Sequence, residues 1–264
     1  MPDLITIFQK RGKLIAMVTI AALAVAAITL QLVPKTYLST TTALPANSLA
    51  TDKASVFNSS IQELYSSLGS PDELDRFLGT AKLDTVYIAV AKQHHLQQHY
   101  SIAQNDHAPY NAALKLKKQT KIERTEYGEL QVRVWDVDRN MAAALANSIM
   151  QQLQQLHQQL QSNSNALVLQ KLKETYAVLK AADTVSAAPM PAAVQQTQAA
   201  EYERLIAQYN LMVNTNPPVL LVVERARPAL TADKPYLWPT LLLTLFAALL
   251  FSLLAALFLE SSKH

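Results

Sequence analysis

Two long stretches without charged residues lie near the two ends of the 264-residue chain. They cover residues 14–33 and 237–259, and leucine, alanine and other apolar residues fill most of their positions. A helix of about 20 apolar residues is long enough to cross a bilayer core of about 30 Å. The pattern therefore predicts two transmembrane helices, which separate short tails (1–13 and 260–264) from a polar segment of residues 34–236.

The charges beside the first stretch indicate how the chain is oriented. Lys10, Arg11 and Lys13 precede it, whereas Lys35 alone follows it closely. Positively charged flanks tend to stay in the cytoplasm, and long loops are translocated largely regardless of their charge. We therefore expect both termini to be cytoplasmic and the polar segment to lie outside the cytoplasm.

A cleaved secretory signal is the alternative for the first stretch, because basic residues precede it and Ala24-Val25-Ala26 resembles a cleavage site. Its apolar run is longer than the 7 to 15 residues that are usual in such signals. We adopt the interpretation of an uncleaved anchor.

Residues that favour strands occur in four places of the polar segment. Residues 37–44 (YLSTTTAL) predict a strand that leaves the membrane, and residues 219–224 (VLLVVE) predict a buried strand. Residues 120–124 and 129–135 flank the turn Glu126-Tyr127-Gly128 and predict a β-hairpin. One face of its second strand carries Leu130, Val132 and Val134.

Two short helices are expected before the hairpin. Ser70-Pro71-Asp72-Glu73 combines a capping serine, a proline at the first helical position and a glutamate that closes the capping box, and Gly79 should end that helix. Residues 84–97 follow with apolar positions at helical spacing. The second helix is expected to bury one face.

The helical pattern then runs without a break from about residue 139 to residue 182, about 66 Å at 1.5 Å per residue. A helix of this length extends beyond a compact domain. Its narrow apolar stripe is typical of a coiled-coil seam, which we expect to be buried partly on a returning helix and partly on a second copy of the chain. The seam consists of Leu145, Ile149, Leu153, Leu156, Leu160 and Leu167, and Leu169, Leu172, Tyr176 and Leu179 continue it after a phase slip.

Pro189 and Pro191 interrupt this pattern, which resumes on a returning helix before Pro217. A helical hairpin is therefore predicted over about residues 139–214. Seven of the eleven residues between 151 and 161 are glutamine. Uncharged amides suit both helix packing and contact with a glycan, and we favour helix packing.

Composition excludes several classes of function. The 4 glycines cannot form a GxxxxGK[ST] or GxGxxG loop, so nucleotide sites of those kinds are absent and no cofactor is expected. A net charge of +3 is too small to indicate nucleic acid. The lack of cysteine is compatible with a domain outside the cytoplasm that needs no disulfide.

Two groups of residues have the chemistry of a metal or catalytic site. His94, His95 and His99 include an i, i+4 pair, but no cysteine or acidic partner stands nearby, so we interpret them as a polar helix end. Asp136 and Asp138 stand where carboxylates accept the free N–H groups of the long helix. We expect capping, and neither a metal site nor a catalytic residue.

Three segments resemble the polysaccharide co-polymerase family, the Wzz-type chain-length determinants of bacterial surface polysaccharides. YLSTTTALPA resembles the family's first extracytoplasmic strand, and VRVWDVDRNMAAALANSIMQQL resembles its strand, aspartate turn and alanine-asparagine helix. VVERARPALTADKP resembles its proline-bearing approach to the second span. Their order between two apolar stretches makes the resemblance fairly specific, and it runs nearly end to end.

The resemblance implies both a fold and a function. The fold would be an α/β base near the bacterial inner membrane with a long protruding helical hairpin, and copies of the chain would form a ring. The protein would not be an enzyme but would regulate the chain length of a surface polysaccharide such as O-antigen or capsule. Its partners would be a separate membrane polymerase and the growing glycan. A membrane-tethered sensor or export adaptor is the alternative for the same arrangement of spans.

The second apolar stretch departs from the family because it contains no glycine. Ala248, Ser252 and Ala256 nevertheless repeat every four residues, and small residues at this spacing let helices approach closely. We expect a transmembrane contact at these positions, although lipid-facing filler explains the same residues equally well.

Overall fold

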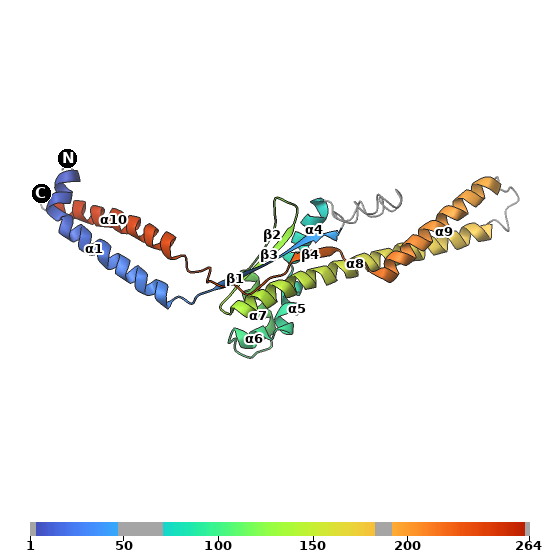
Figure 1. The fold of residues 1–264 in the computed structure, drawn as a ribbon, viewed down its shortest axis with the longest axis horizontal. Helices are drawn as coiled ribbons and strands as arrows, with labels where there is room; N and C mark the ends of the chain where they lie inside the picture. The colour runs from blue at the N-terminus through green and yellow to red at the C-terminus, as the bar shows by residue number, and fades with distance from the viewer. Residues whose placement is uncertain (1–3, 47–70, 183–191, 262–264) are drawn as a thin grey trace. The chain divides into compact units, whose positions relative to one another are not determined.

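The computed structural model describes residues 4–46, 71–182 and 192–261 and has a mixed α/β fold (Figure 1). It divides into two compact units. The first contains the terminal helices together with residues 135–143, and the second contains the remainder of the sheet, most of the long helix and the shorter helices. The helices are α1 (Leu4–Leu32), α4 (Pro71–Ala81), α5 (Asp84–Gln93), α6 (Leu96–His99), α7 (Ala108–Lys118), α8 (Arg139–Ala182), α9 (Ala192–Thr215) and α10 (Leu237–Ser261).

The sheet has four strands in the order β2-β3-β1-β4, which are β1 (Tyr37–Pro45), β2 (Thr120–Arg124), β3 (Leu130–Asp136) and β4 (Leu220–Glu224). The predicted hairpin is confirmed, with Thr120 opposite Val134 and Arg124 opposite Leu130. Gly128 has a φ of 76° in its turn, a value that glycine adopts without steric cost. β1 and β4 are antiparallel, so two segments far apart in the sequence meet in the sheet.

The two faces of the hairpin differ as the alternation of its residues predicted. Leu130, Val132 and Val134 on β3 are fully buried. Arg133, between them, donates to Glu123 of β2 at 2.9 Å and belongs to the opposite face. One face of this ladder therefore belongs to the core, and the other carries ion pairs.

β4 corrects one expectation, because residues 219–224 were predicted to form a buried strand. It lies at the edge of the sheet, and of its five residues only Leu220 is buried. Val222 and Val223 are 40% and 59% exposed. An edge strand has a neighbour on one side only, so its apolar composition did not imply burial.

The shorter helices follow the sequence with three differences. α4 begins at Pro71 as predicted and continues through Gly79 to Ala81, while the expected cap Ser70 lies outside the described residues. The helix expected over residues 84–97 breaks at His95, whose φ of 49° is left-handed. α7 was not predicted, although Pro109 near its start is a helix signal.

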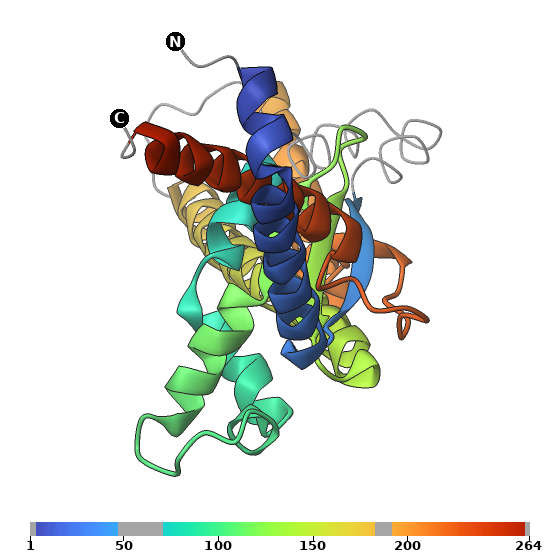
Figure 2. The ribbon, with the colours of Figure 1, turned by 90° about the vertical axis from the view of Figure 1, so that its left-hand side faces the viewer.

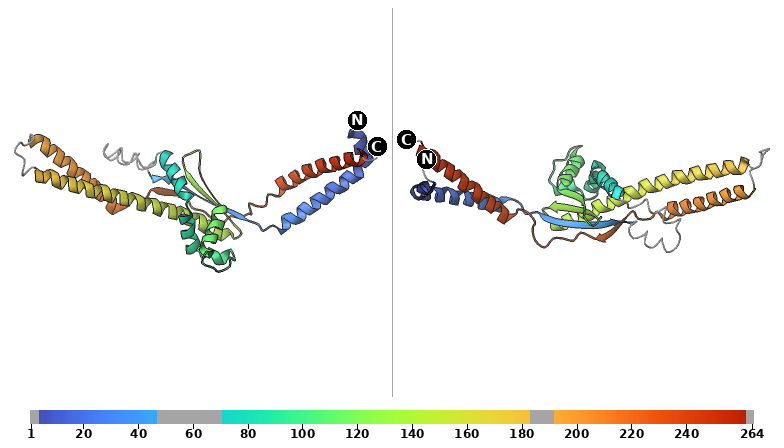
Figure 3. Two further views of the ribbon diagram at one scale, coloured as in Figure 1. Left: turned by 180° about the vertical axis from the view of Figure 1, so that it is seen from behind. Right: turned by 90° about the horizontal axis from the view of Figure 1, so that it is seen from above.

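α8 has the predicted bounds and two different surroundings. Its first half lies along the sheet, and its second half continues past the sheet with α9 antiparallel beside it (Figure 1, Figure 3). The predicted hairpin of helices is therefore present. Its proline-containing connection, with Pro189 and Pro191, lies outside the described residues.

α1 and α10 pack against each other (Figure 1, Figure 2). Within them, Ile15–Leu32 and Leu237–Ala256 are long and apolar enough to cross a membrane, and 11% and 17% of these two spans are buried. Large side chains such as Met17, Leu243 and Phe246 are exposed. Exposed apolar surface on this scale is unfavourable in water and suits contact with lipid.

Candidate functional site: the helical hairpin and the terminal helices

The start of α8 is fixed by two aspartates. Asp138 accepts the backbone N–H of Asn140 at 2.8 Å, which is the expected helix cap. Asp136 accepts the backbone N–H of Asp138 at 2.9 Å and so holds the turn from β3 into α8. Both carboxylates have a structural role at the positions where the sequence predicted capping.

A side chain that sequence reasoning missed ties α8 to the segment after β4. The Asn147 amide donates to the carbonyl oxygen of Ala226 at 3.0 Å and accepts the N–H of Ala226 at 2.9 Å. This pair satisfies both backbone groups of one residue. The only signal in the sequence was a single asparagine among the small residues of an otherwise apolar helix face.

Two histidines connect α8 to shorter helices. His94 Nε2 shares a hydrogen bond of 2.7 Å with Ser148 Oγ of α8, and His157 Nε2 of α8 shares one of 2.6 Å with Thr80 Oγ1 of α4. Phe77 also stacks on His157, with ring centroids 3.9 Å apart. Burial lowers the pKa of both histidines, and the charge of neighbouring His95 lowers the pKa of His94 further.

The histidine cluster of the sequence is not assembled into one site. His94 faces α8, His95 occupies the left-handed turn, and the His99 ring lies 5.0 Å from that of Tyr100. Among the described residues, no three His, Asp or Glu side chains are grouped in a way that could hold a metal ion. The i, i+4 pair fails because the helix breaks at His95.

The predicted seam is divided between two environments. Leu145, Ile149 and Leu153 are fully buried within their own chain. Leu156 is half-buried, whereas Leu160 and Leu167 are 53% and 63% exposed. Only the outer part of the seam is therefore available to another molecule.

The exposed part of the seam faces away from α9. At about 100° per residue, Leu160, Leu167 and Val178 lie within about 20° of one another on α8. Leu169, Lys173 and Tyr176, which are buried or bonded to α9, lie roughly 140° to 180° around the helix from Leu160. The phase slip thus separates a face that packs on α9 from an exposed face, which we term the outer stripe (Leu160, Leu167 and Val178).

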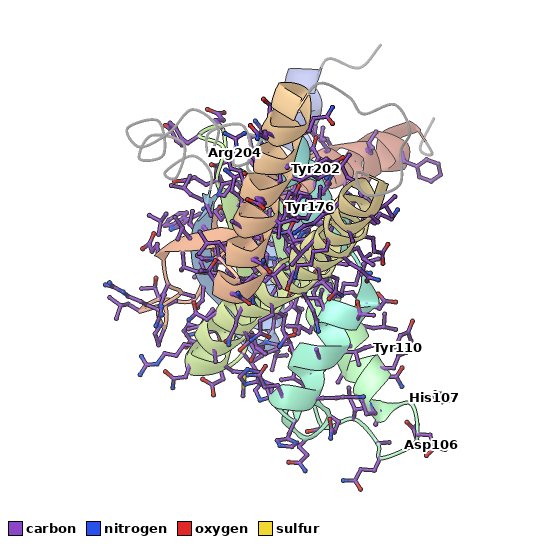
Figure 4. All side chains as sticks on the ribbon, turned by 90° about the vertical axis from the view of Figure 1, so that its right-hand side faces the viewer. Asp106, His107, Tyr110, Tyr176, Tyr202 and Arg204 are labelled. Carbon is purple, nitrogen blue, oxygen red and sulfur yellow. The ribbon has the colours of Figure 1, made fainter. Side chains whose placement is uncertain are left out.

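Polar side chains connect α8 and α9. Tyr176 donates its hydroxyl hydrogen to Glu203 at 2.6 Å, and its ring lies 6.2 Å from that of Tyr202 (Figure 4). The hydrogen bond to Glu203 raises the pKa of Tyr176, and desolvation and the negative charge of Glu203 add to this effect. Lys173 donates to Asn210 at 3.4 Å. Only Leu169 and Met212 are buried along the described length of this pair beyond the sheet.

A cluster around Trp135 joins the end of β3 to the segment before α10. Trp135 Nε1 donates to Asp233 at 2.7 Å, and Lys234 Nζ lies 4.5 Å from the centre of the Trp135 ring. The backbones of Thr36 and Lys234 also pair, with the N–H of Thr36 donating at 3.1 Å. The two segments that enter α10 and leave α1 are therefore bonded to each other.

The small residues of α10 are covered by the chain itself. Ser252 and Ala256 are fully buried and Ala248 is nearly so, and Ala256 packs with Ile15 of α1. Ser252 donates to the carbonyl oxygen of Leu249 at 2.9 Å, so its hydroxyl is satisfied within α10. These positions form a helix contact inside one chain.

Comparisons with known proteins give a limited result. Neither the scan against protein-family models nor the search of curated proteins produced a match. Among solved structures, the chain is similar to a full-length bacterial polysaccharide co-polymerase, at 13% identity and a TM-score of 0.47, covering 100% of this chain and 98% of that one. It is also similar to a fragment of WzzB, a polysaccharide co-polymerase from Salmonella Typhimurium, at 12% identity and a TM-score of 0.39, covering 76% of this chain and 100% of that one. At such values neither structure assigns an activity or a partner to this chain.

Proposed function

We propose that this chain regulates the length of a bacterial surface polysaccharide without catalysing its synthesis, as an oligomeric inner-membrane scaffold beside a separate polymerase. The proposal follows the resemblance of three sequence segments to the Wzz-type chain-length determinants. Its mechanism would lie in the geometry of the assembly and in the exposed surface of the helical hairpin.

One observation carries the proposal: the three segments that resemble the family are bonded to one another. They supply the neighbouring strands β3, β1 and β4. Thr41 of the first segment donates to the carbonyl oxygen of Glu224 in the third at 2.8 Å. Asn147 of the second bonds to Ala226 of the third, as described above. If the three resemblances were due to chance, the segments would not be expected to lie next to one another in the fold.

The outer stripe supports assembly into a homo-oligomer. Its three side chains are 53% to 68% exposed, and α9 lies on the other side of α8, so the hairpin leaves them uncovered. Contacts between neighbours in a ring are heterologous, so the stripe of one copy would pack on a different surface of the next copy. We therefore assign the contact between copies to Leu160 and Leu167, and we assign Leu145, Ile149 and Leu153 to the fold of each copy.

The orientation in the membrane can be tested with single cysteines, because the chain has none of its own. Asn163→Cys on the hairpin should react with a membrane-impermeant thiol reagent in intact spheroplasts. Lys263→Cys in the C-terminal tail should react only after lysis. Protection of position 163 before lysis would contradict a periplasmic hairpin.

The function is tested by deletion in a bacterium that produces the glycan. Loss of a length regulator should replace a clustered distribution of lengths by a broad one, while polymer is still made by the polymerase. An unchanged ladder on a gel would contradict the proposal. Complete loss of polymer would instead favour a role in synthesis or export.

A further inference from the structure

The pair of α1 and α10 is packed closely at one end only. Ile15 of α1 and Ala256 of α10 are buried together with Leu249 and Leu253 packed around them. Towards the other end of the pair, where α1 ends and α10 begins, the ribbons separate (Figure 1, Figure 3). The small residues Ala248, Ser252 and Ala256 lie from the middle of α10 towards its C-terminal end, which explains why close approach is confined to that end.

A groove of about 560 Å³ lies between the separated parts of the two helices. Ile20, Ala24 and Ala27 line it from one face of α1, and Trp238, Leu242 and Leu245 line it from α10. Its size falls within the range of about 300 to 1,000 Å³ that is usual for small-molecule sites. The two alanines make room on one wall, and bulky apolar side chains form the other.

The lining determines what class of molecule the groove can take. Side chains of alanine, leucine and isoleucine offer dispersion contacts and no hydrogen-bonding group, and the ring of Trp238 adds one N–H. Inside a bilayer such a groove would lose those contacts if it stayed empty, and hydrocarbon chains surround it on its open side. An unbranched acyl chain matches this chemistry.

Cations stand at one end of the groove. Lys35 follows the last residue of α1 by three positions, and Lys234 precedes the first residue of α10 by three. Both side chains are exposed, and the Lys234 ammonium also lies over the ring of Trp135. The backbone pairing of Thr36 with Lys234 holds their two segments together. Trp238, which is 78% exposed, lines the groove at this end, and tryptophan is enriched at the level of lipid headgroups.

We infer that this groove binds one acyl chain of an anionic phospholipid, whose phosphate lies beside Lys35 and Lys234. The inference rests on the membrane placement within the proposed function, but it does not depend on any glycan. The occupant is a lipid rather than a helix from a second copy because a lysine flanks each helix at this end of the pair, and these charges complement a phosphate and not an apolar helix.

The test uses the full chain in lipid nanodiscs and reads the fluorescence of Trp238. The chain has 2 tryptophans, so Trp135→Phe leaves Trp238 as the only one. Phosphatidylglycerol with brominated chains, present as a minor component, should quench Trp238 more strongly than brominated phosphatidylcholine at the same fraction. Ala24→Phe with Ala27→Phe should remove this excess quenching, whereas Ala21→Phe, outside the groove lining on the same helix, should retain it.

Substitution of the two lysines tests their contact with the lipid headgroup. Lys35→Gln and Lys234→Gln should each lower the relative affinity for the anionic lipid about fivefold, the usual effect of one cation near a membrane surface. Native mass spectrometry gives a second measurement if a groove variant does not fold. It counts the phospholipids that stay bound to each chain through purification. The variant with both lysine substitutions should retain one phospholipid fewer per chain than the wild type.

Three results would overturn the inference. The first is equal quenching of Trp238 by both brominated lipids. The second is excess quenching that persists in Ala24→Phe with Ala27→Phe. The third is no quenching of Trp238 by either lipid, together with groove variants that change the mass of the assembly. The last result would mean that a helix of a second copy fills the groove. Because purified protein is used, failure here leaves the glycan-length result untouched, and the reverse also holds.

Discussion

The two halves of α8 have the same apolar spacing but different surroundings. In the first half, Leu145, Ile149 and Leu153 are fully buried in the base, and Asn147 binds the segment after β4. In the second half, one face packs on α9, where Tyr176 binds Glu203, and the outer stripe is exposed. The same period therefore serves folding at one end of the helix and, in our proposal, association at the other.

The largest effect is expected in the buried half. Ile149→Ala removes a fully buried side chain and should lower the free energy of unfolding by about 2 to 5 kcal/mol. Leu167→Ala in the exposed half is the matched control and should change it by less than about 0.5 kcal/mol. Urea unfolding of the full chain, in a detergent that dissociates any assembly, measures both. Equal losses would remove the distinction between the two halves.

The next largest effect concerns Asn147. Asn147→Ala leaves both the N–H and the carbonyl oxygen of Ala226 without this partner and should cost about 1 to 3 kcal/mol. Asn163→Ala, an exposed asparagine of the outer half, is the control and should be nearly neutral. The same unfolding measurement checks the pair. A neutral Asn147→Ala would show that the contact with Ala226 does not fix the base.

A smaller effect depends on pH through His94, which contacts the inner part of α8, and His157, which belongs to that part and contacts α4. Their pKa values are lowered in the folded chain, so the unfolded chain takes up protons first as the pH falls. The free energy of unfolding should be constant above the unfolded pKa of about 6.5 and should decrease below it until the folded pKa is passed. His94→Gln with His157→Gln should flatten this dependence. A wild-type curve without such a decrease would contradict the assignment.

The smallest effect on stability is expected in the outer stripe. In the dissociated chain, Leu160→Lys with Leu167→Lys should change the free energy of unfolding by no more than about 0.5 kcal/mol each, because both side chains are exposed there. It should nevertheless reduce the mass of the assembly in mild detergent. Gln159→Lys with Ala166→Lys adds lysines at the same spacing, roughly 100° around the helix, and should leave the mass unchanged. A monomeric wild type would contradict the proposed assembly.

Patterns among neighbouring residues were sufficient to predict much of the fold. The bounds of α8, the capping by Asp138 and the buried face of β3 all follow from residues that are close together in the sequence. The same signals did not distinguish a buried strand from an edge strand, so the exposure of β4 was missed. Strand position depends on partners that the strand itself does not encode.

Long-range contacts account for the part of the site that sequence reasoning missed. Asn147 and Ala226 are 79 positions apart, and Thr80 and His157 are 77 apart. The sequence around each of these residues does not indicate which distant residue it contacts. The seam shows the same limit, since a helical period indicates which side chains share a face but not whether that face meets the sheet, α9 or a second copy.

We predict that the exposed half of α8 sets the length of the glycan, whereas the buried half only stabilises the fold of each copy. The most direct measurement is the polysaccharide ladder of a deletion strain complemented with Leu160→Lys and Leu167→Lys at wild-type protein abundance, beside the Gln159→Lys and Ala166→Lys control. We expect a broad distribution for the stripe variant and a clustered one for the control. A clustered distribution in both strains would contradict the account.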